Sequence, residues 1–292
     1  MLRRDGAVAG VSSVYPAHIP LIGGRRFYVY RSLLTKPVHD HAAAMMRETF
    51  RALDSEFAGE PDSPIGLCAM LAPAQRLQLP AEADWPDPRT VYAGYLDDGR
   101  QVRVAYFDRA NIIPAARMTY RDWQLGAGYE VDLFAGQDAV SAADVIALWN
   151  REAGLPRAEA ERRLGEVIAV ATDSEGHLAG VSTAYLQRSD QLLADMWYLR
   201  GFVAEAHRRS SIVIALAVKG RDELVRRYAD GEDRRGIGLI FEVESELLKR
   251  AYPVAYWPWT DVTFVGENAR GDDVRVHYYP GALTPESGQT SG

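Results

Sequence analysis

Hydrophobic and polar positions along this chain of 292 residues alternate between the spacing typical of strands and that typical of helices. Runs of β-branched and aromatic residues predict strands, whereas apolar residues three or four positions apart predict helices. In the C-terminal half, the predicted strands span 129–134, 166–172, 178–185, 196–203, 237–243, 262–265 and 274–279. The predicted helices span 156–164, 211–228 and 244–252, and a further helix begins near residue 141. This alternation predicts a mixed α/β fold, with α and β elements around a mixed sheet.

Two short motifs in the C-terminal half mark where elements begin. Ser141 is followed three residues later by Asp144, a capping box that starts a helix with Leu148 and Trp149 on its apolar face. Residues 173–176, with the sequence Asp-Ser-Glu-Gly, separate two predicted strands and favour a tight hairpin turn. The front of this half is therefore a strand, two helices and a hairpin.

The N-terminal half shows the same order of periodicities from its first long strand onwards. A strand is predicted over 27–34, and a helix follows it. The apolar stripe of that helix consists of Val38, Ala42, Met45, Met46, Phe50 and Leu53. Each half then continues with a strand, a connection and a closing hairpin.

Repeated sequence accounts for this shared order. Residues 6–15 reappear as 176–185 with six of the ten positions identical. Residues 65–106 correspond without a gap to 237–278, and both segments end on a Val-Arg-Val-x-Tyr motif. Average composition would supply far fewer identities, so we interpret the chain as a duplicated fold.

The repeat defines the domain organisation that we predict. Residues 1–115 form an incomplete, degenerate copy, and residues 116–280 form a complete one. The first copy lacks counterparts of the strand and helices predicted over 129–164. The segment 281–292 is small and polar, which predicts a flexible tail.

Composition narrows the range of partners. The formal net charge of −7 argues against a general attraction to nucleic acid. Cys68 is the only cysteine, so neither an intramolecular disulfide nor a pair of thiolate ligands can form, and a reducing, cytoplasmic location is expected. His39 and His41 are two positions apart near a helix start and diverge, so we expect no metal site. The apolar run near the N-terminus is too short to predict a membrane span.

A basic segment connects the strand that ends at Phe202 and Val203 to the following helix. It reads Arg208-Arg209-Ser210-Ser211-Ile212-Val213. Free N–H groups at a helix start attract anions such as pyrophosphate. The arrangement resembles the GNAT superfamily of N-acyltransferases, in which a Q/R-x-x-G-x-G/A loop grips the pyrophosphate of acetyl-CoA. The resemblance implies a GNAT-like fold in each half and an acetyl-CoA or other acyl-CoA co-substrate bound by these residues.

The basic segment departs from the family pattern at two positions. Ser211 stands where the family has glycine, and Val213 stands where it has glycine or alanine. A Val213 side chain that fills the cleft would exclude a pantetheine arm, whereas an open cleft would admit one. Acyl-carrier protein and aminoacyl-tRNA are therefore alternative donors.

A second feature of the resemblance lies after the strand 237–243. Ser245 and Tyr252 have the spacing of the helix start and tyrosine of the family. The resemblance implies that Ser245 belongs to the cofactor site and that Tyr252 protonates the departing thiolate. A packing role for Tyr252 at the end of a short helix is an equal alternative.

Acidic side chains near the same strand ends are candidates for the acceptor side. Glu205 and His207 follow the central strand, where an attacking amine loses a proton, and we take Glu205 as the catalytic base. For Glu205 and for His207, the alternative is that the residue simply occupies an exposed loop and has no catalytic role. Glu242 and Glu244 alternate along a strand and share one face, so they can bind a cationic acceptor.

The chemical residues are replaced in the N-terminal copy. Asp40 falls in the segment that should bind pyrophosphate, and Pro80 corresponds to Tyr252. We align Ala42 with Ser211. This copy is therefore predicted to be structural, either packing sheet to sheet or completing the substrate groove of the second copy.

The sequence supports an enzyme that moves an acyl group, with acetyl as the first choice, from a CoA thioester to an amine on a small molecule or a peptide. A tandem scaffold that has lost catalysis and binds a protein or ligand is the alternative from another class. The sequence leaves open whether the chain forms a homodimer.

Overall fold

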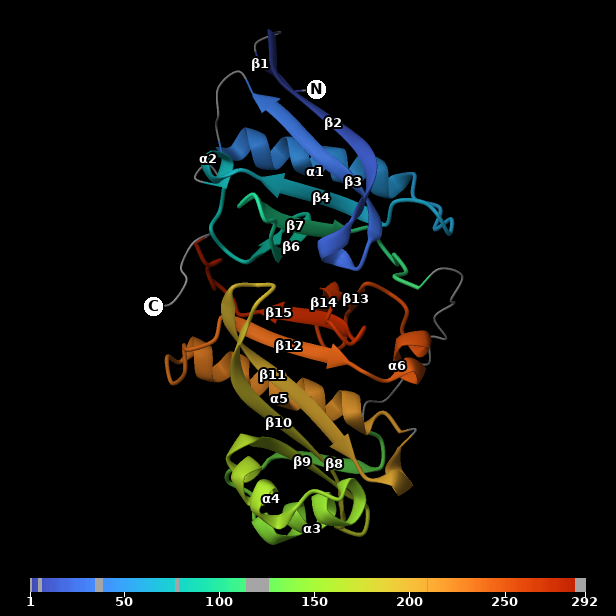
Figure 1. Ribbon diagram of the computed structural model, residues 1–292, viewed down its shortest axis with the longest axis vertical. Coiled ribbons are helices and arrows are strands. Elements are labelled where there is room, and N and C mark those ends of the chain that lie inside the picture. Colours follow the sequence, from blue (N-terminus) through green and yellow to red (C-terminus); the bar gives the residue numbers. More distant parts are fainter. Residues whose placement is uncertain are drawn as a thin grey trace.

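The computed structural model describes residues 2–4, 7–34, 39–76, 79–113, 126–208 and 210–286. Within these residues, Figure 1 shows two mixed sheets, one above the other, each with a long helix running along it. The upper sheet belongs to the N-terminal half and the lower sheet to the C-terminal half. The protein therefore has the mixed α/β class that the sequence predicts.

The lower sheet follows the predicted strands closely. Its strands are β8 (Tyr129–Leu133), β9 (Val167–Asp173), β10 (Leu178–Ser189), β11 (Ala194–Val203), β12 (Gly238–Val243), β13 (Tyr256–Trp257), β14 (Val262–Glu267) and β15 (Asp273–Tyr278). They lie in the order β13-β14-β15-β12-β11-β10-β9-β8. Neighbouring strands are antiparallel except β11 and β12, which run parallel.

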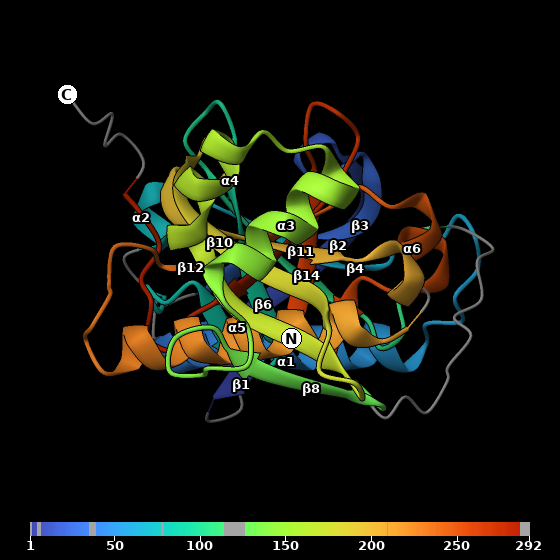
Figure 2. The same ribbon diagram turned by 90° about the horizontal axis from the view of Figure 1, so that it is seen from below.

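Helices cover both faces of the lower sheet. They are α3 (Ala142–Ala153), α4 (Arg157–Arg163), α5 (Ile212–Ala229) and α6 (Glu246–Ala251), with short 3-10 turns η2 (Leu164–Glu166) and η3 (Glu205–His207). Figure 2 shows α3 and α4 on one side of the sheet and α5 on the other. The predicted capping box is confirmed, because the Ser141 side chain accepts from the Asp144 N–H and the Asp144 carboxylate accepts from the Ser141 N–H.

The upper sheet has the same sequence of elements without the front helices. Its strands are β1 (Leu2–Arg4), β2 (Ala7–Ile19), β3 (Arg25–Leu34), β4 (Gly66–Leu71), β5 (Asp84–Pro86), β6 (Arg89–Tyr95) and β7 (Gln101–Tyr106). The helices are η1 (Pro20–Ile22), α1 (His39–Ser55) and α2 (Pro73–Arg76). The strand order is β1-β2-β3-β4-β7-β6-β5. From β2 onwards it matches the order β10-β11-β12-β15-β14-β13 of the lower sheet, and β1 is added at the edge beside β2.

The two sheets repeat one another in register as well as in order. β3 pairs with β4 at Tyr28 and Leu67, and β11 pairs with β12 at the equivalent Trp197 and Leu239. β6 and β14 each carry a bulge at equivalent positions. The sequence repeat is thus a repeat of backbone geometry.

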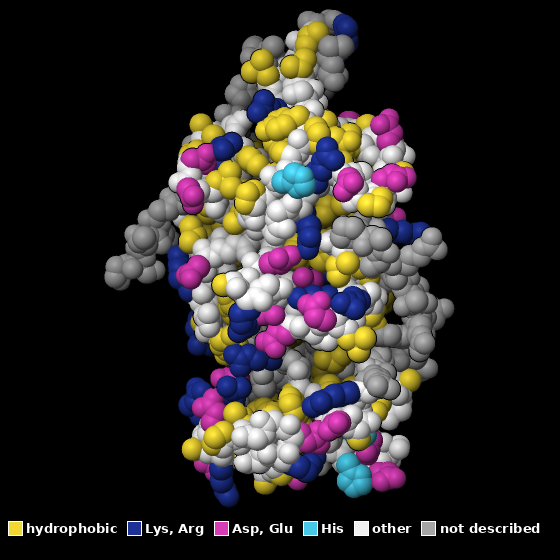
Figure 3. Space-filling view, turned by 45° about the vertical axis from the view of Figure 1, so that its right-hand side comes forward, with side chains coloured by type: hydrophobic (Ala, Val, Ile, Leu, Met, Phe, Trp, Pro, Cys, Tyr) yellow, Lys and Arg dark blue, Asp and Glu magenta, His cyan; other side chains and the backbone are white. Residues whose placement is uncertain are grey.

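Among the described residues the upper sheet has no counterpart of α3 and α4, and part of it is bare. Val181 on β10 is fully buried under α3 and α4, whereas the equivalent Val11 on β2 is 43% exposed. Tyr15 and Leu33 are also exposed large hydrophobic residues of β2 and β3. In Figure 3, hydrophobic side chains gather over the upper half, and charged side chains are mixed with them lower down.

A core shared by both halves holds the sheets together. Its buried side chains come from β3, β4, β6 and β7 of the upper sheet and from β11, β12, β14 and β15 of the lower sheet. The Tyr278 hydroxyl donates to the carbonyl of Tyr92 at 2.8 Å, and the Tyr106 hydroxyl donates to the carbonyl of Phe264 at 2.9 Å. Since these two contacts join equivalent positions, the halves are related by a pseudo-two-fold axis. Sheet-to-sheet packing is therefore the arrangement that the first half adopts.

Each half also contributes a short segment to the other. The Ala83 N–H donates to the Ala282 carbonyl, and the Ala255 N–H donates to the Ala110 carbonyl, both at 2.8 Å. Ala282 follows β15 and Ala110 follows β7, so the chain after each closing hairpin crosses to the opposite half. These crossings make the two halves one structural unit.

The crossing after β15 corrects one predicted boundary. The flexible tail was predicted over 281–292, but Ala282 is buried and the Thr284 N–H donates to the Ala81 carbonyl at 2.9 Å. The small polar side chains hid this order because the backbone makes the contacts. Residues 287–292 lie outside the described part of the chain.

Arg275 secures one of these crossings from inside the protein. Its side chain is fully buried, and its Nη1 donates to the carbonyls of Val254 and Ala255, both at 3.0 Å. The guanidinium lies 4.0 Å from the centre of the Trp257 ring. Arginine suits this place because its planar group can stack and donate at once.

Arg103 secures the equivalent crossing in the upper half. It is fully buried, its Nη2 donates to the Glu82 carbonyl at 2.6 Å, and its guanidinium lies 3.8 Å from the centre of the Trp85 ring. Burial lowers the pKa of Arg103 and of Arg275 to about 10, so both stay charged at neutral pH. The repeated Val-Arg-Val motif thus encodes this buried contact.

Among the described residues, none of the helices combines the length and the apolar character that crossing a bilayer requires.

We predict that Arg275→Met lowers the free energy of unfolding by about 2–4 kcal/mol, because buried carbonyls lose a charged donor. Arg103→Met is expected to lower it by a similar amount. Chemical denaturation followed by circular dichroism measures both changes. The control is Arg270→Met, whose side chain is exposed and whose loss is expected to stay below about 1 kcal/mol. Equal losses in Arg275→Met and Arg270→Met would contradict the prediction.

A polar contact also joins the halves close to the pseudo-two-fold axis. Asp261 accepts from Arg89 at 2.5 Å and from the Tyr256 hydroxyl at 2.8 Å, and His277 Nδ1 lies 3.1 Å from its other oxygen. Burial alone would raise the pKa of Asp261, but these donors outweigh it and hold that pKa well below its ordinary range. The ionised carboxylate is therefore stabilised by folding.

This contact predicts a pH-dependent stability. Because the folded-state pKa of Asp261 is depressed, its contribution is complete above the unfolded value of about 3.9 and is lost as the pH falls below it. We expect Asp261→Asn to melt below the wild type at pH 7, with the difference in Tm shrinking as the pH falls from 5 towards 2. Calorimetric scans over this range measure it, and a constant difference would refute the assignment.

Candidate active site

The lower sheet opens into a cleft where its two parallel strands diverge. β11 and β12 pair only at Trp197 with Leu239 and at Tyr198 with Ile240. Beyond these pairs β11 continues along β10, while β12 stays with β15. The resulting cleft has a volume of about 390 Å³ and lies entirely within the C-terminal half as far as the described residues show. This volume is in the range of small-molecule sites.

The start of α5 forms one wall of the cleft. Val213 lines it together with Gly201 of β11, and a Cβ on Gly201 would lie 3.0 Å from Val213 Cγ2. The valine therefore packs against the glycine, and the cleft remains open beside both. The Ile212 side chain is 1% exposed and buried in the core beneath α5.

The two serines before α5 hold the local backbone. The Ser211 hydroxyl accepts from the Gly126 N–H at 3.0 Å, and the Ser210 hydroxyl donates to the His207 carbonyl at 2.7 Å. Ser211 is the residue before the first helical turn, but its side chain does not cap the helix. The first amides of α5 are largely used locally, because the Ile212 N–H donates to Ser210 Oγ at 3.4 Å and the N–H groups of Ile214 and Ala215 donate to the Ser211 carbonyl at 3.0 and 3.1 Å. The positive end of the helix dipole still favours an anion at this end of α5.

Other residues of the predicted cofactor segment lie further from the cleft. Arg208 is exposed, and its Nε donates to the Val203 carbonyl at 3.2 Å. Phe202 packs against the core beneath α3 and α4, and Val203 packs against the core beneath α5. Arg209 lies outside the described residues.

Tyr252 lies on the opposite wall at the end of α6. It is 5% exposed, and its ring is held edge-on between Trp257 and Trp259, with centroids 5.8 and 5.5 Å away. All three aromatic residues line the cleft. Tyr252 therefore has the packed position that was one of its two predicted alternatives, and it also borders the cleft.

Ser245 fixes the helix that presents Tyr252. Its hydroxyl accepts from the Leu248 N–H at 3.3 Å as the N-cap of α6, and it lines the cleft. The side chain is thus used locally, as is usual for a serine at this position.

Two carboxylates sit at the mouth of the cleft on the side of β12. Glu242 and Glu244 both line it, and Arg270 Nη2 lies 3.2 Å from Glu242 and 3.5 Å from Glu244. Asn268 also donates to Glu242 at 3.1 Å. The predicted pair is therefore brought together, with one arginine between its members.

Glu205 is not brought to the cleft, which corrects its assignment as a base in this site. It begins η3, its side chain is exposed, and its N–H donates to Glu152 at 2.6 Å on the side of α3. His207 lies nearby and contacts the Tyr129 hydroxyl at 3.0 Å. The chain turns away after β11 because η3 packs towards α3, which strand periodicity does not reveal.

Sequence reasoning missed three residues of the cleft. Tyr185 and Tyr198 line it with ring centroids 5.3 Å apart, and the Arg200 guanidinium lies 3.9 Å from the Tyr185 ring centre. The repeat offered a signal, since Arg31 and Tyr15 form the same contact at 4.4 Å in the upper half.

No group of three or more His, Cys, Asp or Glu side chains within the described residues is arranged to hold a metal ion.

Comparison with known proteins yields similar solved structures. No protein-family model matches the sequence, and no curated protein matches it. A GNAT-family acetyltransferase from Streptococcus pneumoniae aligns with 52% of this chain and 99% of its own, at 13% identity and a TM-score of 0.36. A GNAT-family N-acetyltransferase from Escherichia coli in complex with CoA aligns with 55% of this chain and 84% of its own, at 19% identity and a TM-score of 0.33. A GNAT-family acetyltransferase from Brucella melitensis in complex with acetyl-CoA aligns with 55% of this chain and 92% of its own, at 14% identity and a TM-score of 0.31.

The strand order, the parallel pair that splays and the helix that starts beside the opening together define a GNAT-like fold. The chain carries this arrangement twice, with the front elements β8, β9, α3 and α4 described in the lower half.

Proposed function

We propose that the chain is an acyltransferase of the GNAT superfamily that moves an acyl group, in first place acetyl, from a CoA thioester to an amine. The reaction takes place in the cleft of the lower half. The amine nitrogen attacks the thioester carbonyl, a C–N bond forms and the C–S bond breaks. The amine loses a proton and the departing thiolate gains one, so that an amide and free CoA result.

The observation that carries this proposal is the splayed pair β11 and β12 with the start of α5 beside the opening. An extended thioester arm can lie between the strands, where the backbone groups of β11 beyond Tyr198 are no longer paired with β12. Its phosphates would then face the start of α5, where the helix dipole favours negative charge. Catalysis of this kind rests mainly on positioning.

Tyr252 supports the chemical step. Its phenol lies in the cleft wall, fixed between Trp257 and Trp259, and a group with an ordinary pKa near 10 can give a proton to a thiolate as it forms. The two indoles limit the movement of the ring. We therefore assign Tyr252 as the general acid.

Glu242 and Glu244 support an acceptor that carries positive charge. They stand at the cleft mouth, and Arg270 occupies the place between them that an ammonium group would take. A cationic small molecule or a peptide amine would displace this arginine. Since Glu205 lies outside the cleft, Glu242 is proposed to receive the proton of the attacking amine, directly or through water.

Acetyl-CoA binding is the first test. We expect wild-type protein to bind acetyl-CoA with a dissociation constant in the micromolar range by calorimetric titration. The variant Arg208→Glu with Ser211→Glu is expected to lose at least about tenfold in affinity, because a carboxylate at the helix start competes with phosphate. Lys219→Glu, further along α5, is the control and should bind as the wild type does. Failure of the wild type to bind would favour another donor or a non-catalytic scaffold.

Removal of the phenol tests the chemical step separately. We expect Tyr252→Phe to lower kcat about 10²–10⁴-fold while acetyl-CoA affinity stays within about twofold, because only proton donation is lost. Release of CoA thiol with spermidine or a lysine peptide as acceptor measures the rate. Tyr228→Phe, on the far end of α5, is the control. An unchanged kcat in Tyr252→Phe would remove this residue from the mechanism.

A further inference from the structure

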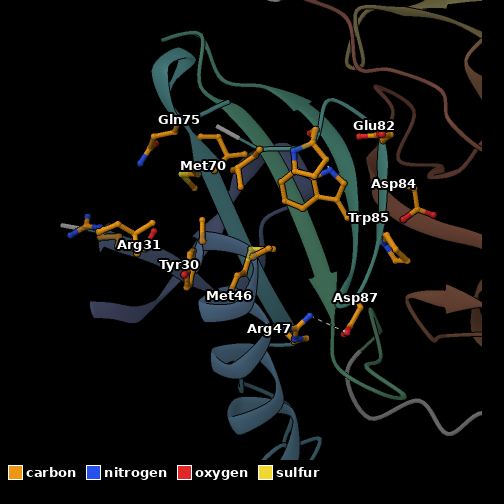
Figure 4. A pocket seen from close by; sticks show the side chains of 18 of the residues that line it. Tyr30, Arg31, Met46, Arg47, Met70, Gln75, Glu82, Asp84, Trp85 and Asp87 are labelled. Atoms are coloured by element: carbon orange, nitrogen blue, oxygen red, sulfur yellow. Dashed lines mark hydrogen bonds and ion pairs between the residues drawn. The ribbon is translucent and has the colours of Figure 1, made fainter. Parts of the chain in front are cut away.

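The upper half contains its own cleft at the position equivalent to the proposed active site. β3 and β4 pair at Tyr28 with Leu67 and at Tyr30 with Ala69, and then separate as β11 and β12 do. The cavity between them has a volume of about 870 Å³, against about 390 Å³ in the lower half. Figure 4 shows side chains from both strands and from α1 around it. The half that lacks the acyltransferase residues thus has the larger cavity.

Two substitutions between the repeats explain the difference in size. Tyr252 and Trp259 fill part of the lower cleft, and the equivalent positions in the upper half hold Pro80 and Asp87. Both replacements are much smaller. The loss of two aromatic side chains, with the backbone frame preserved, leaves the extra space.

The helix wall shows the true alignment of the two copies. Ala42, Ala43 and Met46 line the upper cleft as Val213, Ile214 and Ala217 line the lower one. The helices therefore correspond with an offset two residues larger than the sequence alignment gave, which corrects the pairing of Ala42 with Ser211.

The wall of the upper cleft is apolar and adaptable. Met70 replaces Glu242, and Met46, Leu71 and Trp85 are buried around the cavity. Thioether side chains fit themselves to ligands of irregular shape. Burying hydrocarbon against such a wall is favourable in proportion to the area removed from water.

Trp85 is held as a rigid part of this wall. Its Nε1 donates to the Pro80 carbonyl at 3.2 Å, and Arg103 covers one ring face at 3.8 Å. In Figure 4 the indole stands beside Met46 and Met70 at the centre of the cavity. The indole is thus fixed before any ligand enters.

The charges at the cavity are arranged unequally. Arg47 lies 3.6 Å from Asp87, a contact marked in Figure 4, so that pair is internally compensated. Arg31 lies at the opposite side, where its guanidinium rests on Tyr15 and its Nη2 donates to the Tyr15 hydroxyl at 3.1 Å. Within the described residues, no carboxylate forms an ion pair with Arg31. Glu82 and Asp84 also line the cavity, on the side away from Arg31 in Figure 4, and Asp84 lies 3.6 Å from Arg89. Among the described residues, Arg31 is therefore a cation without an ion-pair partner at the end of the cavity away from these carboxylates.

We propose that the upper cleft is a second ligand site, which binds an elongated hydrophobic monocarboxylate with its tail against Met46, Met70 and Trp85 and its carboxylate at Arg31. The site is separate from the acyltransferase cleft and does not depend on its activity.

The test is calorimetric titration of the full chain with hexanoate, octanoate and decanoate. Affinity is expected to rise with chain length, by up to about fourfold for each methylene group buried. Octan-1-ol, which lacks the carboxylate, should bind at least fivefold more weakly than octanoate. Saturating acetyl-CoA should leave octanoate binding unchanged, because the two clefts are distinct. Absence of binding by decanoate, or competition with acetyl-CoA, would overturn the proposal.

Substitutions that introduce the equivalent residues of the lower half test whether the ligand binds in this cleft. Pro80→Tyr with Asp87→Trp should weaken octanoate binding at least tenfold by filling the cavity, and Met70→Glu, which restores the acidic residue, should do the same by repulsion. Arg31→Gln should weaken octanoate and leave octan-1-ol unchanged, whereas the equivalent Arg200→Gln should affect neither. Circular dichroism confirms that each variant is folded. Unaltered binding by folded Met70→Glu and Arg31→Gln would also overturn the proposal.

Discussion

The burial of Arg103 and Arg275 is the constraint on which the rest of the structure depends. A guanidinium buried away from water needs other groups to offset the lost hydration, and here backbone carbonyls and an indole contact each one. At Arg275 only Nη1 donates hydrogen bonds to other described residues, and Nη2 lies 3.6 Å from the buried Asp273 carboxylate. The carbonyls belong to the segment before β6 or β14, which also receives the crossing strand of the opposite half. One buried charge therefore organises the closing hairpin, the segment before it and the contact between the halves.

The same arginines set the walls of both clefts. Trp85 and Trp257 each stack on the buried guanidinium with one face and line a cavity on the other side. Their indole N–H groups donate to the equivalent carbonyls of Pro80 and Tyr252. The position of Tyr252 is thus tied through Trp257 to the contact between halves, so the lower half would lose part of its site if separated from the upper one.

Much of the fold could be predicted because its signals are local. The capping box at Ser141, the alternation along β9 and β10, and the repeated motif around Arg103 each depend on neighbouring residues. The crossing at Ala282 could not be predicted, since its backbone bonds leave no pattern in small side chains. Tyr252 and Glu242 lie near helix and strand ends, and both of these predicted site residues line the cleft. Glu205 does not, because its place depends on how η3 turns towards α3.

The two clefts show how one backbone frame supports different chemistry. Register, bulges and buried arginines are common to both halves, so these features serve folding and do not distinguish the sites. The difference lies in side chains that point into the opening: Tyr252 against Pro80, Trp259 against Asp87, and Glu242 against Met70. Of these six positions only Met70 packs against the core between the sheets, and it is partly buried there, so the cleft side chains could diverge without loss of the fold. The upper half has thus kept the cleft while replacing the phenol and the acid that acyl transfer would use.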